Sequence, residues 1–270
     1  MRAGTLCAVL VMCGCTDAQK NQFVIKFFEP RRTPQQQMLA AFAAEDSDQR
    51  RAALAKVAKS KVRDADWAIK GYVTIALLDS DPQARCVAIR ALARGRDPRA
   101  LETLLKLLNH RDYPPQEVRP PDELCRWDAT AALADLAAAG AVAPEQLDPA
   151  RQAFIDRLRL DTSPHVRLAA ARGLSCCPHE ESVRALIERM DDENFAVVHQ
   201  CEDSLARLTG VTQHCDAQAW KDWLAENESD LFAHAGDVPP SRAQPYRNRL
   251  EKMGHDLTQF VRWLVPGSKE

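Results

Sequence analysis

Residues 161–174, DTSPHVRLAAARGL, decide the fold, because residues 79–92, DSDPQARCVAIRAL, follow the same frame. In both stretches an Asp is followed by Pro after three residues, Arg after six, Ala after nine and Leu after thirteen. Three weaker copies surround them, so that Arg, or Val in the last copy, recurs at positions 50, 85, 126, 167 and 198. Steps of 35, 41, 41 and 31 residues are typical of proteins built from repeated helix pairs.

Each part of the frame has a mechanical reason. Asp or Ser before Pro is a helix N-cap followed by the residue best suited to the first helical position. The Ala and Leu of the frame, four residues apart, share one helical face, and the small Ala lets a neighbouring helix approach closely. A second helix follows each first one, and the pairs Asp97-Pro98 and Asp148-Pro149 are expected to begin two of them. The sequence therefore predicts an all-α fold, an α-solenoid of about five helix pairs.

These residues resemble HEAT repeats of the short type that also occurs in phycobilisome-lyase-like proteins. The resemblance implies that Asp at the turn and Arg within the first helix bridge adjacent repeats. It assigns this role to Asp79, Asp81, Arg85, Asp161 and Arg167. The ending from Leu208 to Trp223 also resembles exported bacterial HEAT proteins, in which the tryptophans belong to the terminal cap. Solenoids serve mostly as binding surfaces, so the family implies a fold more than an activity.

The composition supports the helical prediction and excludes several classes of protein. The 270 residues are 46% hydrophobic but only 6% aromatic, which leaves little material for a β-sandwich. The formal net charge of −2 does not favour sequence-independent binding of nucleic acid, so no nucleic acid partner is expected. No run approaches the 18 apolar residues that a membrane-spanning helix needs.

The N-terminus resembles a bacterial lipoprotein signal. Arg2 is followed by an apolar stretch and then by Gly14-Cys15. Two positions depart from the usual signal: Met12 stands where the family prefers Leu, and Cys13 stands where it prefers Ala, Ser or Thr. The resemblance implies that residues 1–14 are removed, that Cys15 carries lipid, and that the protein is anchored in the bacterial cell envelope. The resemblance also implies, from Thr16 after the cysteine, an anchor in the outer membrane, with a periplasm-facing anchor as the alternative. A cleaved secretory protein and an uncleaved cytosolic start remain as alternatives.

The remaining chain divides by composition. A tether is expected over residues 15–33, the repeats over 34–226, a Pro-containing linker over 227–245 and a C-terminal amphipathic helix over 246–265. That helix has an apolar stripe from Leu250 to Leu264 and a basic excess. It is expected to dock on its own protein, with a membrane surface and a partner helix as alternatives.

Cysteine and histidine gather between residues 176 and 215. Five of these side chains follow the ends of successive first helices, where stacking of the repeats could bring them to one edge: Cys176, Cys177, His179, His214 and Cys215. Core thiols, a disulfide such as Cys177 to Cys215, and a metal site are the three interpretations left open. The spacing matches no established zinc pattern.

The sequence contains no nucleophile elbow, no phosphate-cradling Gly-rich loop and no H-E-x-x-H pair, so no enzyme and no cofactor are predicted. The expected function is a lipid-anchored scaffold that binds other envelope proteins. Because second helices line the concave face of HEAT solenoids, its contact residues are expected to be Arg99, Glu102, Lys106, Arg184 and Glu188. The alternatives are a lyase-like or assembly-factor role on a tetrapyrrole or other cofactor, and metal binding at the 176–215 edge.

Overall fold

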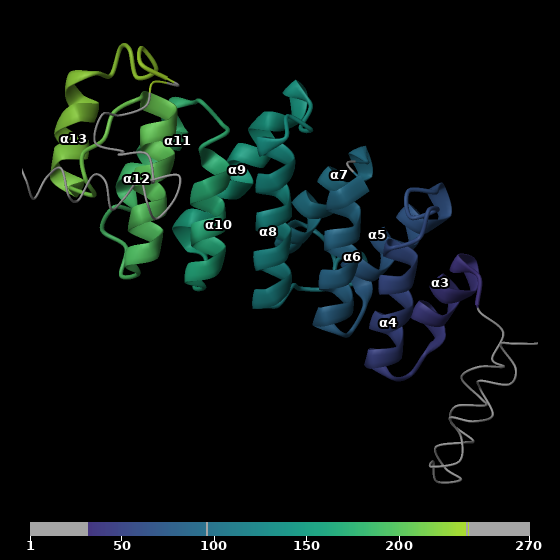
Figure 1. Ribbon diagram of the computed structural model, residues 1–270. Helices are drawn as coiled ribbons and strands as arrows, with labels where there is room; N and C mark the ends of the chain where they lie inside the picture. Colours follow the sequence, from purple (N-terminus) through teal and green to yellow (C-terminus); the bar gives the residue numbers. More distant parts are fainter. Residues whose placement is uncertain (1–31, 96, 236, 238–270) are drawn as a thin grey trace, which may run out of the picture. The chain divides into compact units, whose positions relative to one another are not determined.

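The computed structural model describes residues 32–95, 97–235 and 237, and these residues are all-helical (Figure 1). They form eleven α-helices and one short 3-10 helix, with no strand among the described positions. In chain order the helices are α3 (Pro34–Ala43), α4 (Ser47–Ala58), α5 (Asp66–Leu78), α6 (Pro82–Gly95), α7 (Pro98–Leu108), η2 (His110–Asp112), α8 (Glu123–Ala138), α9 (Pro144–Leu160), α10 (Pro164–Leu174), α11 (Glu180–Glu188), α12 (Phe195–Thr209) and α13 (Ala217–Glu226). No helix among them is long and apolar enough to cross a bilayer.

The chain divides into two compact units, and α7 contributes residues to both. The first unit holds the described residues up to Thr103 together with Tyr113–Pro120. Within it, α4 packs on α6, and α3 packs on both α4 and α5. Helices α4 and α6 therefore lie in one layer, with α3 and α5 in the other.

The second unit holds Leu104–Asp112 and the described residues from Pro121 onward. Helix α10 packs between α8 and α12, and these three form a first-helix layer that faces the viewer in Figure 1. Helix α11 contacts α9 and α13, and these three form a second-helix layer behind it. Each first helix is followed along the chain by a second helix, as the frame predicts.

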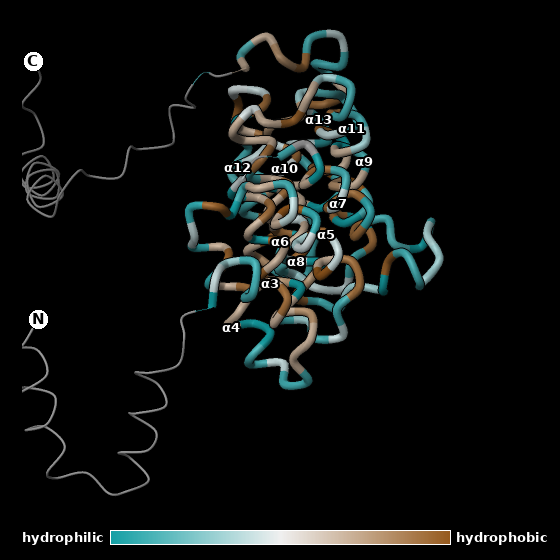
Figure 2. Tube along the Cα trace, turned by 90° about the vertical axis from the view of Figure 1, so that its right-hand side faces the viewer, coloured by the Kyte–Doolittle hydropathy of each residue, from teal (hydrophilic) through white to brown (hydrophobic). Residues whose placement is uncertain are grey.

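The frame explains why these helices pack. Its Ala positions, or Cys in the last copy, are at most 4% exposed: Ala53, Ala88, Ala129, Ala170 and Cys201. Its Leu positions are completely buried: Val57, Leu92, Leu133, Leu174 and Leu205. Burying one such aliphatic side chain contributes about 1.5–3 kcal/mol. Figure 2 shows the resulting alternation of hydrophobic and hydrophilic residues along the helices.

The prediction that a second helix begins at Asp148-Pro149 is wrong. Helix α9 begins at Pro144, and Pro149 lies inside it. Pro149 is the sixth residue of α9, beyond the first turn, so α9 lacks there the N–H that would donate to the Glu145 carbonyl oxygen. Pro144 at the first position is the actual start signal, preceded by Ala143 with an extended backbone.

Helices α9 and α10 approach each other closely at Gly173. A Cβ atom added there would lie 2.4 Å from Cε1 of the Phe154 ring, which is completely buried. The absence of a side chain at Gly173 therefore makes room for the largest apolar residue of α9.

Candidate functional site

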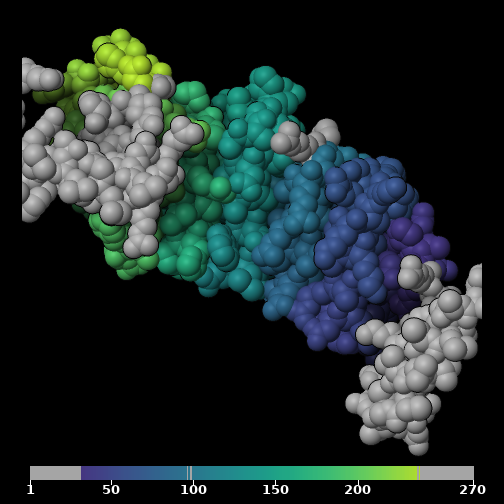
Figure 3. Space-filling model, viewed as in Figure 1, coloured from purple at the N-terminus to yellow at the C-terminus, as the bar shows by residue number. Residues whose placement is uncertain are grey.

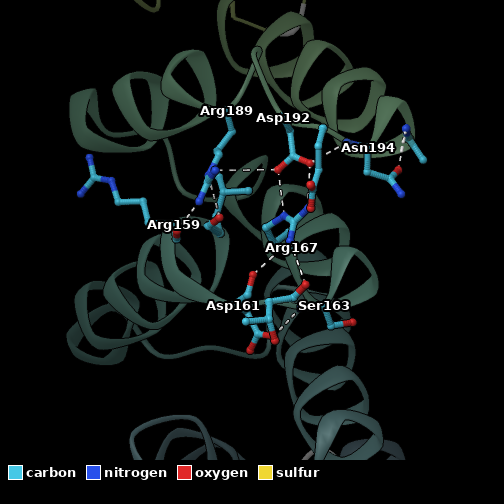
Figure 4. A network of polar contacts seen from close by, with 11 residues as sticks. Arg159, Asp161, Ser163, Arg167, Arg189, Asp192 and Asn194 are labelled. Carbon is cyan, nitrogen blue, oxygen red and sulfur yellow. Dashed lines mark hydrogen bonds and ion pairs between the residues drawn. The ribbon is translucent and has the colours of Figure 1, made fainter.

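Arginines of the first helices connect consecutive repeats in the second unit (Figure 4). The Arg167 guanidinium on α10 binds both carboxylate oxygens of Asp192, with Nε–Oδ2 and Nη2–Oδ1 distances of 2.8 Å. Its Nη1 donates to the carbonyl oxygens of Asp161 and Thr162, each at 3.1 Å. The side chains of Arg167 and Asp192 are only 6% and 1% exposed. One buried guanidinium thus joins the loop before α10 to the loop before α12.

The same arrangement occurs one repeat earlier. Arg126 on α8 binds Asp161 through Nε–Oδ2 at 2.7 Å and Nη2–Oδ1 at 3.1 Å. Its Nη1 donates to the Pro121 carbonyl oxygen at 3.3 Å, in its own preceding loop. Asp161 also accepts from the backbone N–H of Ser163, as Asp192 does from that of Asn194. Each aspartate therefore shapes the turn before its own first helix while it binds the arginine of the previous repeat.

These aspartates are ionised at neutral pH. Burial would raise the pKa of Asp192, but hydrogen bonds from Arg167 and from the Asn194 backbone hold it below the ordinary value. Burial acts in the same direction on Asp161, and Arg126 with the Ser163 backbone lowers its pKa overall.

In the first unit, Arg50 repeats the contact with an aspartate, and Arg85 binds backbone carbonyl oxygens. Arg50 binds Asp79 with an Nη2–Oδ1 distance of 3.3 Å, and Asp81 caps α6 by accepting from the Ala84 N–H at 3.0 Å. Arg85, which is 2% exposed, donates to the backbone carbonyl oxygens of Ala76 at 2.9 Å, Arg119 at 2.8 Å and Pro120 at 3.1 Å. The Pro-rich insertion thus supplies two of the carbonyl oxygens that accept from Arg85.

At least three of the five predicted contact residues on second helices make ion pairs with side chains of neighbouring segments. Arg99 binds Asp66 of α5 at 2.6 Å, and Glu188 accepts both donors of the Arg159 fork at 2.7 and 2.9 Å. Arg184 binds Glu180 and Glu228. Glu102 is exposed and Lys106 is half-buried. Side chains already engaged in this way are poorer candidates for binding a partner than the sequence suggests.

The structure does not gather the predicted cysteine and histidine edge into one centre. The Cys177 thiol is buried and lies 3.8 Å from the Gly173 carbonyl oxygen, and burial raises its pKa to about 11. His179 is the N-cap of α11 and accepts from the Glu181 N–H. His214 and Cys215 lie in a left-handed turn. All six cysteines of the described segments are free thiols, and no group of three or more His, Cys, Asp or Glu side chains there could hold a metal ion.

A buried carboxylate that sequence reasoning missed organises this turn. Glu202 of α12 accepts hydrogen bonds from the Trp220 indole at 2.6 Å and from the backbone N–H groups of Gln213 and Cys215 at 3.1 Å each. The Thr212 hydroxyl also donates to it. Burial would raise the pKa of Glu202, but these bonds hold it below its usual value. Glu202 of α12 therefore connects α12 to α13 through the hydrogen bond from Trp220.

A row of exposed large side chains also escaped the sequence analysis. On α8, Leu124 and Trp127 are 45% and 39% exposed, and the Trp127 ring lies 5.2 Å from that of His165 on α10. On α12, Phe195 is 70% exposed and its ring lies 6.3 Å from that of His199. All five side chains belong to helices of the first-helix layer, whose teal part, around α8 and α10, faces the viewer in Figure 3. We call this set the aromatic row.

The predicted signal segment, Cys15, most of the tether and the C-terminal amphipathic helix lie outside the described residues. No protein-family model matches the chain, and no curated protein matches it either.

Proposed function

We propose that this protein is a non-enzymatic scaffold, a HEAT-like α-solenoid anchored in the bacterial envelope through lipid on Cys15, which binds another envelope protein. The solenoid interpretation is supported by the Arg126–Asp161 and Arg167–Asp192 pairs, which recur with a step of 41 residues between the arginines. A stack of repeats requires the same kind of contact between each helix pair and the next.

The observation that carries the binding function is the aromatic row. Exposed aromatic side chains are enriched at protein interfaces, and Trp is among the residues that contribute most to binding. Single exposed apolar residues are ordinary, but here Trp127 and Phe195 each pair with a histidine on the same layer of helices. This layer is thus a better candidate interface than the ion-paired second helices, where the sequence places it.

Site-specific photo-cross-linking in living cells tests the proposal. A photoreactive phenylalanine replaces Trp127, and in a matched control it replaces Gln152, an exposed residue on the second helix α9. We expect a discrete adduct with one envelope protein from position 127 and none from position 152. Equal adducts from both positions, or none from position 127, would contradict the proposed interface.

The partner identified in this way then allows a quantitative test. Trp127→Ala is expected to weaken its binding by about 2 kcal/mol, roughly thirtyfold, if Trp127 is a central contact. Gln152→Ala is expected to leave binding unchanged.

A further inference from the structure

The aromatic row runs across three neighbouring helices rather than along one. Leu124 of α8 and His165 of α10 each stand two residues before the frame arginine of their helix. Trp127 directly follows that arginine on α8, and His199 follows the corresponding position on α12. Because α10 packs between α8 and α12, equivalent positions of the three helices lie side by side. The 5.2 Å between the Trp127 and His165 rings shows this contact between the first two helices.

The exposed apolar surface of the second unit is concentrated in this row. Of the five exposed large hydrophobic side chains described in that unit, three belong to it, namely Leu124, Trp127 and Phe195. The other two, Leu147 and Leu160, stand thirteen residues apart on α9. With about 8–10 Å between the axes of packed helices, a row over three helices is about 16–20 Å long. An apolar stripe along a helix of about fourteen residues has the same length.

The exposed charge beside the row is acidic. Glu123, at the start of α8, is exposed. The Glu193 side chain, two residues before α12, is 85% exposed although Nη2 of Arg167 lies 3.4 Å from it. The arginines in the same turns, Arg126 and Arg167, bind aspartates of the next repeat and are only 19% and 6% exposed. An apolar helix with basic flanks is therefore attracted to this surface, and one with acidic flanks is repelled.

The chain itself contains a segment of this chemistry, residues 246–265, which we call the tail segment. Its apolar residues recur at helical spacing from Leu250 to Leu264, over about 21 Å at 1.5 Å per residue. Its polar positions include four basic and two acidic side chains: Arg247, Arg249, Lys252, Arg262, Glu251 and Asp256. The length of the stripe matches that of the aromatic row, and its excess charge is opposite to that of the exposed glutamates.

The last described residues lie within reach of the row. The backbone of His234 packs against Gly210, which caps the C-terminal end of α12. Phe195, at the other end of α12, is fifteen residues away, which is about 22 Å along the helix. Residues 238–249 can extend over about 40 Å. The tail segment can therefore reach the row without any movement of α12.

We infer that the tail segment binds as an amphipathic helix across the aromatic row of its own chain. Its apolar stripe covers Trp127 and Phe195, and its basic side chains lie towards Glu123 and Glu193. The partner of the proposed function uses the same surface, so this regulatory consequence rests on that function. The partner must displace the tail segment to bind, and the free protein keeps the row covered.

Photo-cross-linking of the purified protein tests this contact without any partner. The full chain carries Cys15→Ala, which removes the proposed lipid and the need for detergent, and a photoreactive phenylalanine in place of Trp127. We expect an internal adduct with the mass of one chain, in which peptide mapping joins position 127 to residues 246–265. An adduct with the mass of two chains would assign the row to a second copy. That result, or no adduct with the tail segment, overturns the inference.

Two variants of the tail segment separate its apolar stripe from a general effect of charge. Leu257→Glu places a carboxylate in the middle of the stripe and should reduce the internal adduct at least about tenfold, because the charge would be desolvated against the row. Gln259→Glu adds the same charge on the opposite face of the helix and should leave the adduct unchanged. Equal loss in both variants would overturn the inference. Vesicles of phosphatidylglycerol should not remove the wild-type adduct; its disappearance would assign the tail segment to a membrane surface instead.

Competition gives a second readout that separates the tail contact from the proposed function. For a partner found by cross-linking in cells, Leu257→Glu should tighten binding at least about threefold, because a larger fraction of the protein then has an open row. Gln259→Glu should not change the affinity, and an unchanged affinity in Leu257→Glu would overturn the competition. An internal adduct without any partner in cells refutes the proposed function alone. A partner adduct from position 127 without an internal adduct refutes the tail contact alone.

Discussion

Removal of the Arg167 guanidinium by Arg167→Met should be among the most damaging changes in the second unit. The substitution keeps much of the apolar stem but deletes the two 2.8 Å bonds to Asp192 and the two 3.1 Å bonds to backbone carbonyl oxygens. Asp192, whose side chain is 1% exposed, would keep the Asn194 backbone bond and a distant contact with Arg189 at 4.0 Å. Breaking a buried pair by removing one partner costs about 3–5 kcal/mol.

Urea unfolding followed by circular dichroism measures this loss. With a slope of roughly 2 kcal/mol per molar urea, the midpoint should fall by about 1.5–2.5 M. Arg172→Met is the matched control on the same helix, because the Arg172 and Asp135 side chains are 45% and 67% exposed and such pairs contribute about 0–1 kcal/mol. Hydrogen exchange should accelerate mainly in α12, whose preceding loop Arg167 holds. A loss of unfolding free energy below about 1 kcal/mol, or equal losses in both variants, would refute the conclusion that the Arg167–Asp192 pair holds the two loops together.

The pH dependence of the same pair has a definite sign. The pKa of Asp192 in the folded protein lies below its ordinary value of 3.8. Its contribution to stability is therefore present above about pH 4 and is lost as the pH falls through the folded pKa. In Arg167→Met the desolvated carboxylate loses its main partner and its pKa rises, so Asp192 no longer contributes to the acid-induced loss of stability. The difference in stability between the wild type and the variant should therefore shrink as the pH falls below about 4.

Three further predictions concern the second unit. Gly173→Ala should lower stability by about 1–3 kcal/mol in thermal unfolding, because the new methyl group meets Phe154 at 2.4 Å; an unchanged midpoint would contradict this close approach. Glu202→Gln should lower the free energy of unfolding by about 2–4 kcal/mol and change Trp220 fluorescence, because an amide NH2 would face N–H donors. In the wild type, the contribution of Glu202 to stability is lost as the pH falls through its folded pKa, which lies below 4.5. Full stability of the variant would contradict this role of Glu202. Cys201, with its pKa raised to about 12 by burial, should react with iodoacetamide only after unfolding, and rapid labelling of the native protein would exclude a core thiol.

Much of the helical packing follows from the sequence, because the frame encodes local physics. Small residues recur where two helices must approach, and aliphatic residues recur four positions later on the same face. Ala170 and Leu174 are buried as the frame requires, and Pro164 begins α10 as predicted. The start of α9 could not be chosen between Pro144 and Pro149, because both are proline signals and only packing decides between them.

The candidate sites were harder to predict because they depend on contacts between segments distant in sequence. Two partners of Arg85 are the carbonyl oxygens of Arg119 and Pro120, 34 and 35 residues away, which carry no side-chain signature. Glu202 looks like an ordinary helix glutamate, and only the fold brings Trp220 and the preceding turn to it. The aromatic row is spread over three helices, so no local pattern reveals it. For residues 176–215 the sequence left core thiols, a disulfide and a metal site open, because spacing alone does not show that Cys177 is buried or that His179 caps α11.

The most direct test of a lipid-anchored binding scaffold is the cross-link from position 127 repeated in Cys15→Ala cells, with intact-mass analysis of both proteins. We expect a wild-type mass that lacks residues 1–14 and includes acyl chains, and a membrane-associated adduct that is absent in the variant. An unchanged mass, with the same adduct in both strains, would contradict the anchor and the envelope partner together.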